Sequence, residues 1–576
     1  MKINNTVVVA KVLDISPNFP INTSLLMVET YDLIVIGGGC NGTGIARDAA
    51  MRGLKTLLVE KNDFSAGTTG ASSGMIHGGP RYMQYEIGTT KLACQDAAAI
   101  RHIAPHLCFR IPFLVPVRQE NKAKLKALWS LELVETFFEA YDRFSPMKGG
   151  KSHTRLSKEE VQKLEPSLPS DTLGAITFDE WGIDTQRLCV SNALSARDFG
   201  ATIRNHTLVK QILRDRDLVY GVVTRHTKTG EELTIRAKMV FNATGPWAPQ
   251  LAAMAGVEVK LRPSKGIHLL FDRRLTNMAV ISQCIDGRQI FINPHENTTL
   301  LGTTDDDYFG DLDNIPVTED EIEYLLEGIA PVFPEIRQAR IITTWRGVRP
   351  TLYGRGVYED ELSREHEIVD HEERDGVSGL LTMLGGKLAS FRIMAEEATD
   401  LICKKLHSNQ PCRTAVVPLP GGASVPEPQH LASEFNIHPY VAERLIFRQG
   451  GKAKELLQRK DFSKTIICPC EPVTTGEAQH AIVDEGALTL SDVRRRTRLG
   501  MGPCQGCLCT LPAASLLEEG RSQGSPLQQS GDFISDIKDF LQDNWVARAP
   551  ILRGDQVAQE EMLQMIFQGV LDLGNN

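Results

Sequence analysis

Five of the twelve cysteines lie close together near the C-terminal end of the sequence. They form a C-x-C pair and, further along the chain, a C-x2-C-x-C group: Cys468, Cys470, Cys504, Cys507 and Cys509. Thiolates that converge from two short loops can hold an iron–sulfur cluster or a zinc ion. We expect no export signal, because Lys11 interrupts the apolar run at residues 7–10. In the reducing compartment that this implies, clustered thiols are metal ligands or redox centres rather than disulfides.

A second group of residues that could bind a ligand is the glycine-rich turn near residue 40. Gly37, Gly39 and Gly42 form a G-x-G-x-x-G pattern between an apolar run at residues 32–36 and a helical segment at 45–51. A side chain at these glycines would block both the tight turn and the approach of a pyrophosphate to the helix N-terminus. Glu60 ends the next apolar strand, where its carboxylate can accept hydrogen bonds from a ribose. The spacing predicts a dinucleotide site at the opening of a βαβ unit.

Position along the chain favours FAD over NAD as that dinucleotide. A later apolar strand runs into Ala243, Thr244 and Gly245, and a helix led by glycines begins near residue 385. Segments this far apart in sequence suit a long dinucleotide that spans a large domain better than a compact NAD-binding unit.

Charge and composition exclude several classes of protein. The chain carries 63 Lys and Arg against 72 Asp and Glu, a net charge of −9, so no global basic field exists to bind nucleic acid. With 42% hydrophobic and 23% charged residues, the composition is that of an ordinary globular protein. No run of 18 apolar residues occurs, so we expect no transmembrane helix.

The alternation of apolar strands with helices predicts an α/β fold in several parts. A Pro- and Gly-rich stretch at residues 417–422 marks the main boundary. The expected parts are an N-terminal extension at 1–30, an FAD-binding domain at 31–415 with a β-rich substrate domain interleaved at about 80–200 and 250–380, a linker and helical segment at 416–460, a small helical cysteine-rich module at 461–520, and C-terminal helices at 521–576.

Three helical patterns invite a structural interpretation. Residues 120–145 carry apolar side chains at spacings of three and four, including Trp129 and Leu133, which indicates a buried helix face. A basic run at residues 494–498 is typical of a solvated helix face, with docking to an acidic partner or a lipid headgroup as the alternative. An apolar stripe at residues 533–541 is expected to pack on the protein itself.

Several motifs together resemble the FAD-dependent glycerol-3-phosphate dehydrogenases: residues 72–82 (SSGMIHGGPRY), Gly302–Asp305, Gly347–Pro350 and Gly385–Lys387. The cysteine-rich tail is most similar to the catalytic subunit of the anaerobic members of that family, and the resemblance covers about residues 31–570. It implies a glutathione-reductase-like FAD-binding fold with a β-rich substrate domain. The implied reaction is oxidation of sn-glycerol 3-phosphate to dihydroxyacetone phosphate.

The family pattern implies specific roles for residues near the flavin. Four side chains would surround the substrate phosphate, where guanidinium forks match phosphate oxygens: Arg81, Tyr82, Arg349 and Arg364. His77 is the candidate base for the C2 hydroxyl, because an imidazole needs little tuning to act near pH 7. Lys387 is the candidate for stabilising negative charge, and Arg349 completes the catalytic group. The implied cofactor-binding residues are Gly37, Gly38, Gly39, Asn41, Gly42, Glu60, Thr68, Ser72, Ser73, Ala243, Gly245, Gly386 and Lys387.

The cysteine-rich module resembles bacterioferritin-associated ferredoxins, which implies a [2Fe–2S] cluster rather than zinc, although zinc stays open. Three of its ligands would be Cys468, Cys470 and Cys504. The fourth is Cys509 if the C-x4-C spacing of the related subunits applies, and Cys507 if the C-x2-C spacing of the smaller modules applies.

Such a cluster passes single electrons. The resemblance therefore implies electron delivery to the quinone pool through a second flavin subunit, together with a membrane-anchored iron–sulfur subunit. The chain is expected at the cytoplasmic face of the inner membrane, as a peripheral protein. Two other functions stay open: a sarcosine- or opine-type amine dehydrogenase, which can share an FAD fold and a cysteine-rich module, and a non-catalytic flavin electron-transfer subunit. Both are disfavoured by the arginines suited to phosphate.

Overall fold

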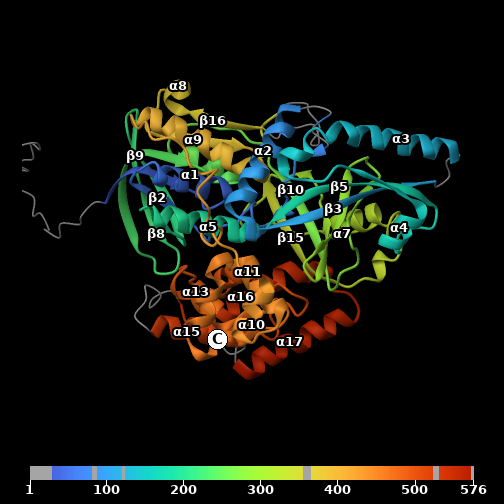
Figure 1. The fold of residues 1–576 in the computed structure, drawn as a ribbon. Helices are drawn as coiled ribbons and strands as arrows, with labels where there is room; N and C mark the ends of the chain where they lie inside the picture. Colours follow the sequence, from blue (N-terminus) through green and yellow to red (C-terminus); the bar gives the residue numbers. More distant parts are fainter. Residues whose placement is uncertain are drawn as a thin grey trace, which may run out of the picture.

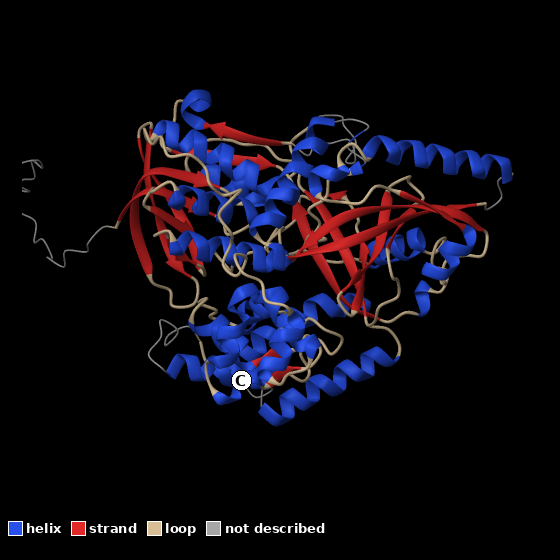
Figure 2. Cartoon of the chain, viewed as in Figure 1, coloured by secondary structure: helices blue, strands red, loops and turns tan. Residues whose placement is uncertain are grey.

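The structure is a computed structural model that describes residues 29–80, 83, 87–119, 124–354, 365–522 and 531–571. Two β-sheets lie side by side in the upper part of the molecule, and a group of helices lies beneath them (Figure 1; Figure 2). Of the predicted site residues, Arg81, Tyr82 and Arg364 lie outside the described residues, as does most of the expected N-terminal extension. No described helix combines the length and the apolar character needed to cross a membrane.

The first sheet contains the dinucleotide-binding topology. Its strands lie in the order β16-β17-β9-β1-β2-β6, with parallel pairing from β17 to β6 and with the hairpin β7-β8 attached through β9. The bounds are β1 Thr30–Ile36, β2 Thr56–Val59, β6 Thr202–Arg204, β7 Thr207–Asp215, β8 Leu218–His226, β9 Glu232–Asn242, β16 His366–Asp370 and β17 Leu380–Gly385. Leu33, Ile34 and Val35 in β1 are fully buried, as a central parallel strand covered on both faces requires.

Three helices cover one face of this sheet: α1 (Cys40–Met51), α5 (Thr185–Asp198) and α9 (Phe391–Lys405). The α1 helix begins five residues before the expected segment at 45–51. Two glycines in its first turns have low helix propensity, so the sequence alone does not indicate a helix there. The β2 strand ends at Val59, directly before Glu60, as the sequence predicts. The α1 helix therefore starts directly at the end of β1, where the glycine-rich turn lies.

The second sheet is mostly antiparallel and lies on the right of Figure 1. Its order is β14-β10-β13-β12-β11-β3-β5-β4, with β15 paired to β10 and one parallel contact between β11 and β3. The bounds are β3 Cys108–Arg118, β4 Thr154–Ser157, β5 Thr172–Ile183, β10 Ser264–Phe271, β11 Ala279–Gln283, β12 Gln289–His295, β13 Thr298–Gly302, β14 Asp306–Asp307 and β15 Ile341–Arg349. Strands from separate stretches of the chain thus form one continuous sheet.

The remaining helices of the upper part are α2 Ile87–Ile103, α3 Lys124–Tyr141, α4 Lys158–Leu164, α6 Ala248–Met254, α7 Glu319–Ile329 and α8 His371–Asp375. Of these, α3, α4 and α7 pack on this second sheet, whereas α6 and α8 pack on the first sheet and α2 lies beside α9. The α3 helix extends away from the body of the molecule (Figure 1). Trp129 is 65% exposed and Leu133 is 68% exposed, so the predicted buried face is wrong for these two side chains. A helix that projects beyond the sheet has nothing to bury its outer turns against.

The helices beneath the sheets form one unit, with Cys468 and Cys509 buried in its core. Their bounds are α10 Pro428–Phe435, α11 Pro439–Gln449, α12 Ala453–Gln458, α13 Thr475–Val483, α14 Leu490–Thr497, α15 Thr510–Ser522, α16 Phe533–Arg548 and α17 Asp555–Leu571, with a short β-hairpin of β18 Ile466–Cys468 and β19 Val473–Thr474. The predicted stripe at 533–541 packs here: Ile537 and Phe540 are buried in the same core as Cys468 and Cys509.

Buried ion pairs hold this helical unit against the FAD domain. Arg496 contacts Asp63 through two hydrogen bonds of 2.5 and 2.9 Å, and neither side chain is exposed. Asp492 bonds to His206 at 2.8 Å. Arg498 bonds to Glu471 at 2.9 Å within the unit. The basic run therefore is not the solvated helix face that its composition indicates, because two of its arginines are buried in ion pairs.

Candidate active site

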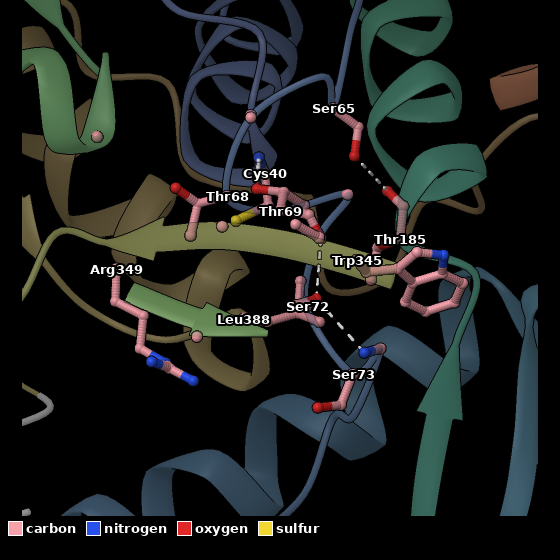
Figure 3. Close-up of a pocket in the computed structure, with 18 of the residues that line it drawn as sticks. Cys40, Ser65, Thr68, Thr69, Ser72, Ser73, Thr185, Trp345, Arg349 and Leu388 are labelled. Carbon is pink, nitrogen blue, oxygen red and sulfur yellow. Dashed lines mark hydrogen bonds between the residues drawn. The ribbon is translucent and has the colours of Figure 1, made fainter. Parts of the chain in front are cut away.

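A cavity of about 1850 Å³ lies where the two sheets and the helical unit meet. Pockets for drug-sized ligands fill roughly 300–1,000 Å³, so this volume suits a dinucleotide together with a small substrate. The glycine-rich turn, the end of β2, the loop after it and residues 385–389 before α9 border the cavity, and so do strands β10 and β15. Figure 3 shows polar side chains from several of these elements around it.

The glycine-rich turn lies at one end of the cavity, and its packing excludes side chains. A Cβ on Gly42 would lie 1.8 Å from the carbonyl oxygen of Gly37, and a Cβ on Gly37 would lie 2.5 Å from that of Ala243. Gly37 also has a φ of +112°, which residues with a side chain rarely adopt. The N-cap residue of α1 is a glycine, which has no side chain to cap the helix, and the Cys40 N–H donates to the Thr69 hydroxyl at 3.2 Å. The positive end of the helix dipole still faces the cavity, where it favours an anion.

Glu60 lies at the same end, on the wall formed by the end of β2. Its Oε2 accepts a hydrogen bond from the Gly38 N–H at 2.6 Å, and its Oε1 accepts one from the Asn62 N–H at 2.8 Å. Burial raises its pKa above the usual value, while these two hydrogen bonds act in the opposite direction. The carboxylate is therefore fixed beside the turn, in the position where ribose hydroxyls of a dinucleotide bind in this topology.

The other predicted cofactor residues border the cavity at its centre. Ser72 donates to the Thr69 carbonyl at 2.8 Å (Figure 3). Thr68 donates to the Val348 carbonyl at 2.6 Å, and the Ser73 hydroxyl contacts His268 Nε2 at 2.8 Å. Ala243, Gly245, Gly386 and Lys387 border the same cavity. Gly386 has a φ of +86°, and a Cβ there would lie 2.1 Å from Met394 Cε.

Arg349 ends β15 with its guanidinium held at the cavity wall (Figure 3). Nη1 donates to Asp305 Oδ1 at 2.9 Å and to the Ser264 hydroxyl at 3.2 Å. Nη2 donates to the Thr303 hydroxyl at 3.0 Å. Its side chain is 26% exposed and thus still accessible from the cavity. A guanidinium fixed in this way presents a preorganised charge to an anionic substrate.

His77 borders the same cavity, in the loop between residues 76 and 79. The structure therefore brings His77, Lys387 and Arg349 to one cavity from three separate stretches of sequence.

Two aromatic residues of the site are absent from the sequence-based predictions. His268 on β10 bonds to Ser73, and burial, with the charges of Arg349 and His295 added, lowers the pKa of His268 to about 3. Trp345 on β15 packs at 6.2 Å from His268 between ring centroids and at 5.1 Å from His295. An isolated His or Trp in an apolar strand looks like a core residue in sequence. Only the pairing of β10 with β15 reveals that both border a cavity.

Four cysteines of the helical unit lie close enough to influence one another. Among them, Cys509 acts most strongly on Cys468, and Cys504 acts on Cys470. Cys509, together with the amides of Gly500 and Glu471, lowers the pKa of Cys468 to about 6, whereas burial, the largest cause, raises that of Cys470 to about 11.

Cys507 is exposed, and the charges acting on it come from Cys504 and Arg548. Four thiols from two loops are a donor set that suits iron–sulfur clusters and zinc. Nevertheless, no set of three or more His, Cys, Asp or Glu side chains in the described part of the chain is already arranged as a metal site.

Comparison with known proteins agrees with this architecture. Residues 32–392 match the family model described as FAD dependent oxidoreductase, and residues 412–517 match the C-terminal domain of alpha-glycerophosphate oxidase. The chain belongs to this family of FAD-dependent oxidoreductases, and the predicted α/β FAD-binding fold with a C-terminal helical unit is confirmed.

Within that family the chain groups with the glycerol-3-phosphate dehydrogenases, as the sequence motifs indicate. It is 32% identical over 554 residues to a chain of Escherichia coli strain K12 that is named as a subunit of anaerobic glycerol-3-phosphate dehydrogenase, covering 95% of this chain and 97% of the relative. It is 34% identical over 564 residues to a chain of Haloferax volcanii with the same kind of name, covering 95% and 91%. A solved glycerol-3-phosphate dehydrogenase from Bacillus halodurans, complexed with FAD, superimposes with a TM-score of 0.69 at 26% identity, covering 91% of this chain and 96% of that one.

Proposed function

We propose that this protein oxidises sn-glycerol 3-phosphate to dihydroxyacetone phosphate with FAD, and that the electrons leave through partner subunits to a quinone. The observation that carries the proposal is the single cavity, which joins the glycine-rich turn to an arginine fixed by Asp305. The names of the similar proteins support the choice of substrate, because they are glycerol-3-phosphate dehydrogenases at more than 30% identity.

The residues around the cavity fit a bound FAD. The glycine-rich turn and the start of α1 can bind the pyrophosphate, Glu60 the ribose, and Thr68, Ser72 and Ser73 can lie along the remainder of the cofactor. Bound FAD supplies the acceptor for the hydride that leaves C2 of the substrate.

The chain's own residues do the rest of the chemistry. Arg349, together with Arg81, Tyr82 and Arg364, binds the substrate phosphate and orients C2. His77 takes the proton of the C2 hydroxyl. Lys387 stabilises the negative charge that develops at the reacting centre.

The cysteine-rich unit would hold a [2Fe–2S] cluster with Cys468, Cys470, Cys504 and Cys509 as ligands. The electrostatics support this choice, since Cys468, Cys470 and Cys504 all act on Cys509, whereas Cys507 is exposed and is influenced only by Cys504 among the cysteines. A cluster there would supply one-electron transfer. Zinc is the competing occupant, and measurement of iron and acid-labile sulfide separates the two.

The electron acceptor is a partner protein in this proposal. The similar chains from Escherichia coli and Haloferax volcanii are named as subunits, which supports an assembly of several chains. The partners that we propose are a second flavin subunit, together with a membrane-anchored iron–sulfur subunit. This chain would then be peripheral on the cytoplasmic face of the inner membrane.

Anaerobic mixing of the purified holoprotein with glycerol 3-phosphate tests the reaction. We expect bleaching of the flavin absorbance by glycerol 3-phosphate and none by sarcosine. Arg349→Ala should raise the glycerol 3-phosphate concentration that gives half-maximal bleaching by about 10- to 100-fold, since a charge-assisted hydrogen bond is worth about 1.5–3 kcal/mol. Arg337→Ala, at an exposed ion pair with Glu323, is the matched control. Bleaching by sarcosine alone would indicate an amine dehydrogenase, and no bleaching by either substrate would indicate a non-catalytic subunit.

A further inference from the structure

A buried group of three polar side chains lies behind the loop that carries His77. It comprises Tyr141 at the end of α3, Lys148 in the short helix Ser145–Lys148, and Glu180 on β5. Lys148 Nζ lies 2.7 Å from Glu180 Oε2 and 3.0 Å from the Tyr141 hydroxyl, and the Tyr141 hydroxyl donates to Glu180 Oε1 at 2.5 Å. Lys148 has no exposed side-chain surface and Glu180 only 2%. A lysine and a glutamate this deeply buried are tolerated only when each neutralises the other.

The group is connected to the His77 loop through the next residue, Gly78. The Gly78 N–H donates to Glu180 Oε2 at 3.3 Å. A Cβ at Gly78 would lie 2.4 Å from the Tyr141 hydroxyl and 2.5 Å from Cys94 Sγ, so the loop backbone is pressed directly against the group. Because His77 and Gly78 share a peptide unit, a shift of the group moves the backbone that carries the imidazole.

The position of Lys148 is fixed independently of the loop. Its Nζ also donates to the Asp179 carbonyl at 2.7 Å, and its own carbonyl accepts a hydrogen bond from Arg101 at 2.5 Å. Arg101 in turn stacks on the Trp181 ring at 3.5 Å. The ammonium is therefore held by β5, and the Lys148 backbone is held by α2, so that the group forms a fixed support for the loop.

Charge is the second feature of the group. Glu180, His77 and Lys387 border one cavity. The polar groups that face Glu180 are Lys148, the Tyr141 hydroxyl and the Gly78 amide, and the Cys94 thiol on α2 is influenced by Lys148, Glu180 and Lys387. Burial, and next the Glu180 charge, raises the pKa of Tyr141, so the phenol stays a donor. An unpaired carboxylate at this wall would repel an anionic substrate, and the Lys148 ammonium cancels that charge.

We propose that Tyr141, Lys148 and Glu180 are positioning residues that fix the His77 loop through the Gly78 amide while keeping this wall of the cavity electrically neutral for an anionic substrate. The proposal rests on the proposed function for the roles of His77 and of the substrate phosphate. It assigns no chemical step to the three residues themselves.

Four variants test it by steady-state kinetics of the holoprotein with glycerol 3-phosphate and an artificial dye acceptor. Tyr141→Phe removes one hydrogen bond without changing any charge. Lys148→Met leaves Glu180 unpaired, and the double variant Lys148→Met/Glu180→Gln removes both charges. Arg110→Met is the matched control, because Arg110 on β3 pairs with Asp179, the neighbour of Glu180 on β5, but its side chain is 47% exposed. FAD content and thermal unfolding are measured for each variant.

We expect Tyr141→Phe to lower kcat by about tenfold with KM little changed, because misplacement of a catalytic group affects the chemical step. Lys148→Met should raise KM by about three- to tenfold as well, because an uncompensated charge repels the substrate. The double variant should restore KM but not kcat, and Arg110→Met should match the wild type.

A wild-type kcat for Tyr141→Phe, or a KM in the double variant as high as in Lys148→Met, would overturn the proposal. A merely structural group would instead lower FAD content in all variants without separating kcat from KM. If Lys148→Met does not fold, the proposal is tested by kcat and KM of the Tyr141→Phe variant and of the double variant. Failure of the wild type to turn over glycerol 3-phosphate would reject the proposed function, and this is seen before any variant is compared.

Discussion

Replacing Arg496 by methionine removes one partner of an ion pair that is buried on both sides. The Arg496 guanidinium makes two hydrogen bonds to Asp63, and it also donates to the Asp492 carbonyl at 3.1 Å and to the Glu485 carbonyl at 3.3 Å. Neither Arg496 nor Asp63 has exposed side-chain surface. Removing one partner of such a pair leaves an unpaired charge in the interior and costs about 3–5 kcal/mol.

That free energy weakens the attachment of the helical unit to the FAD domain. At 1.4 kcal/mol per factor of ten, the undocked or unfolded population rises by about 140- to 3,700-fold. Limited proteolysis at the connecting segment, residues 406–427, together with the free energy of unfolding, measures this change. Arg553→Met is the matched control, because Arg553 pairs with Glu319 and Glu323 on the surface and its loss should cost about 1 kcal/mol or less.

The double variant Arg496→Met/Asp63→Leu separates the charge from the packing. Replacing both members of a buried ion pair by apolar residues of similar volume is often neutral or stabilising. We therefore expect the double variant to recover most of the stability that the single variant loses. Equal cleavage rates for Arg496→Met and Arg553→Met would refute the argument that this pair holds the two parts together.

Three further predictions concern the cofactors and acid stability. Gly42→Ala should abolish FAD retention, measured by flavin absorbance after gel filtration, because the new Cβ would lie 1.8 Å from a backbone oxygen. Cys509→Ser should lose iron and sulfide while Cys507→Ser keeps them, measured by chemical analysis. Burial by itself raises the pKa of Glu485, but the charges of Arg187 and His480 hold it well below its usual range. The stability that results is present above the unfolded-state pKa of about 4.3 and should be lost as pH falls below it, measured by unfolding at a series of pH values.

Each of these has a matched control. Gly569→Ala, in α17 with no atom near the new Cβ, should keep full flavin content. Equal iron loss in both cysteine variants would contradict the assignment of the fourth ligand. Glu485→Gln should be less stable at neutral pH and should lose less stability on acidification than the wild type. If that variant loses as much unfolding free energy on acidification as the wild type does, the acid-sensitive stability does not come from Glu485.

The sequence predicted the elements that depend on local pattern. The G-x-G-x-x-G turn, the acid that ends the next strand and the motifs at residues 302–305, 347–350 and 385–387 all lie on one cavity, because each is a turn or strand end whose residue types are set by its own geometry. The resemblance to glycerol-3-phosphate dehydrogenases that these motifs indicate agrees with the similarity to such proteins over most of the chain.

What the sequence could not reveal are pairings between distant residues. Arg496 and Asp63 are 433 positions apart, and nothing near either one indicates the other. Lys148 and Glu180 look like surface charges in sequence, because burial of such a pair depends on how α3, β5 and the loop at residue 78 pack. For the α3 helix the prediction fails in the opposite direction. Its apolar spacing indicates burial, but its outer turns extend beyond the sheet and stay exposed.

The most direct test of the account is a single-turnover reaction under anaerobic conditions. The holoprotein is mixed with a small excess of glycerol 3-phosphate, and the dihydroxyacetone phosphate formed is measured against the flavin bleached. We predict one molecule of dihydroxyacetone phosphate for each flavin reduced, and a strongly reduced rate in Arg349→Ala at the same concentration. Flavin that stays oxidised, or that is bleached without formation of dihydroxyacetone phosphate, would contradict the account.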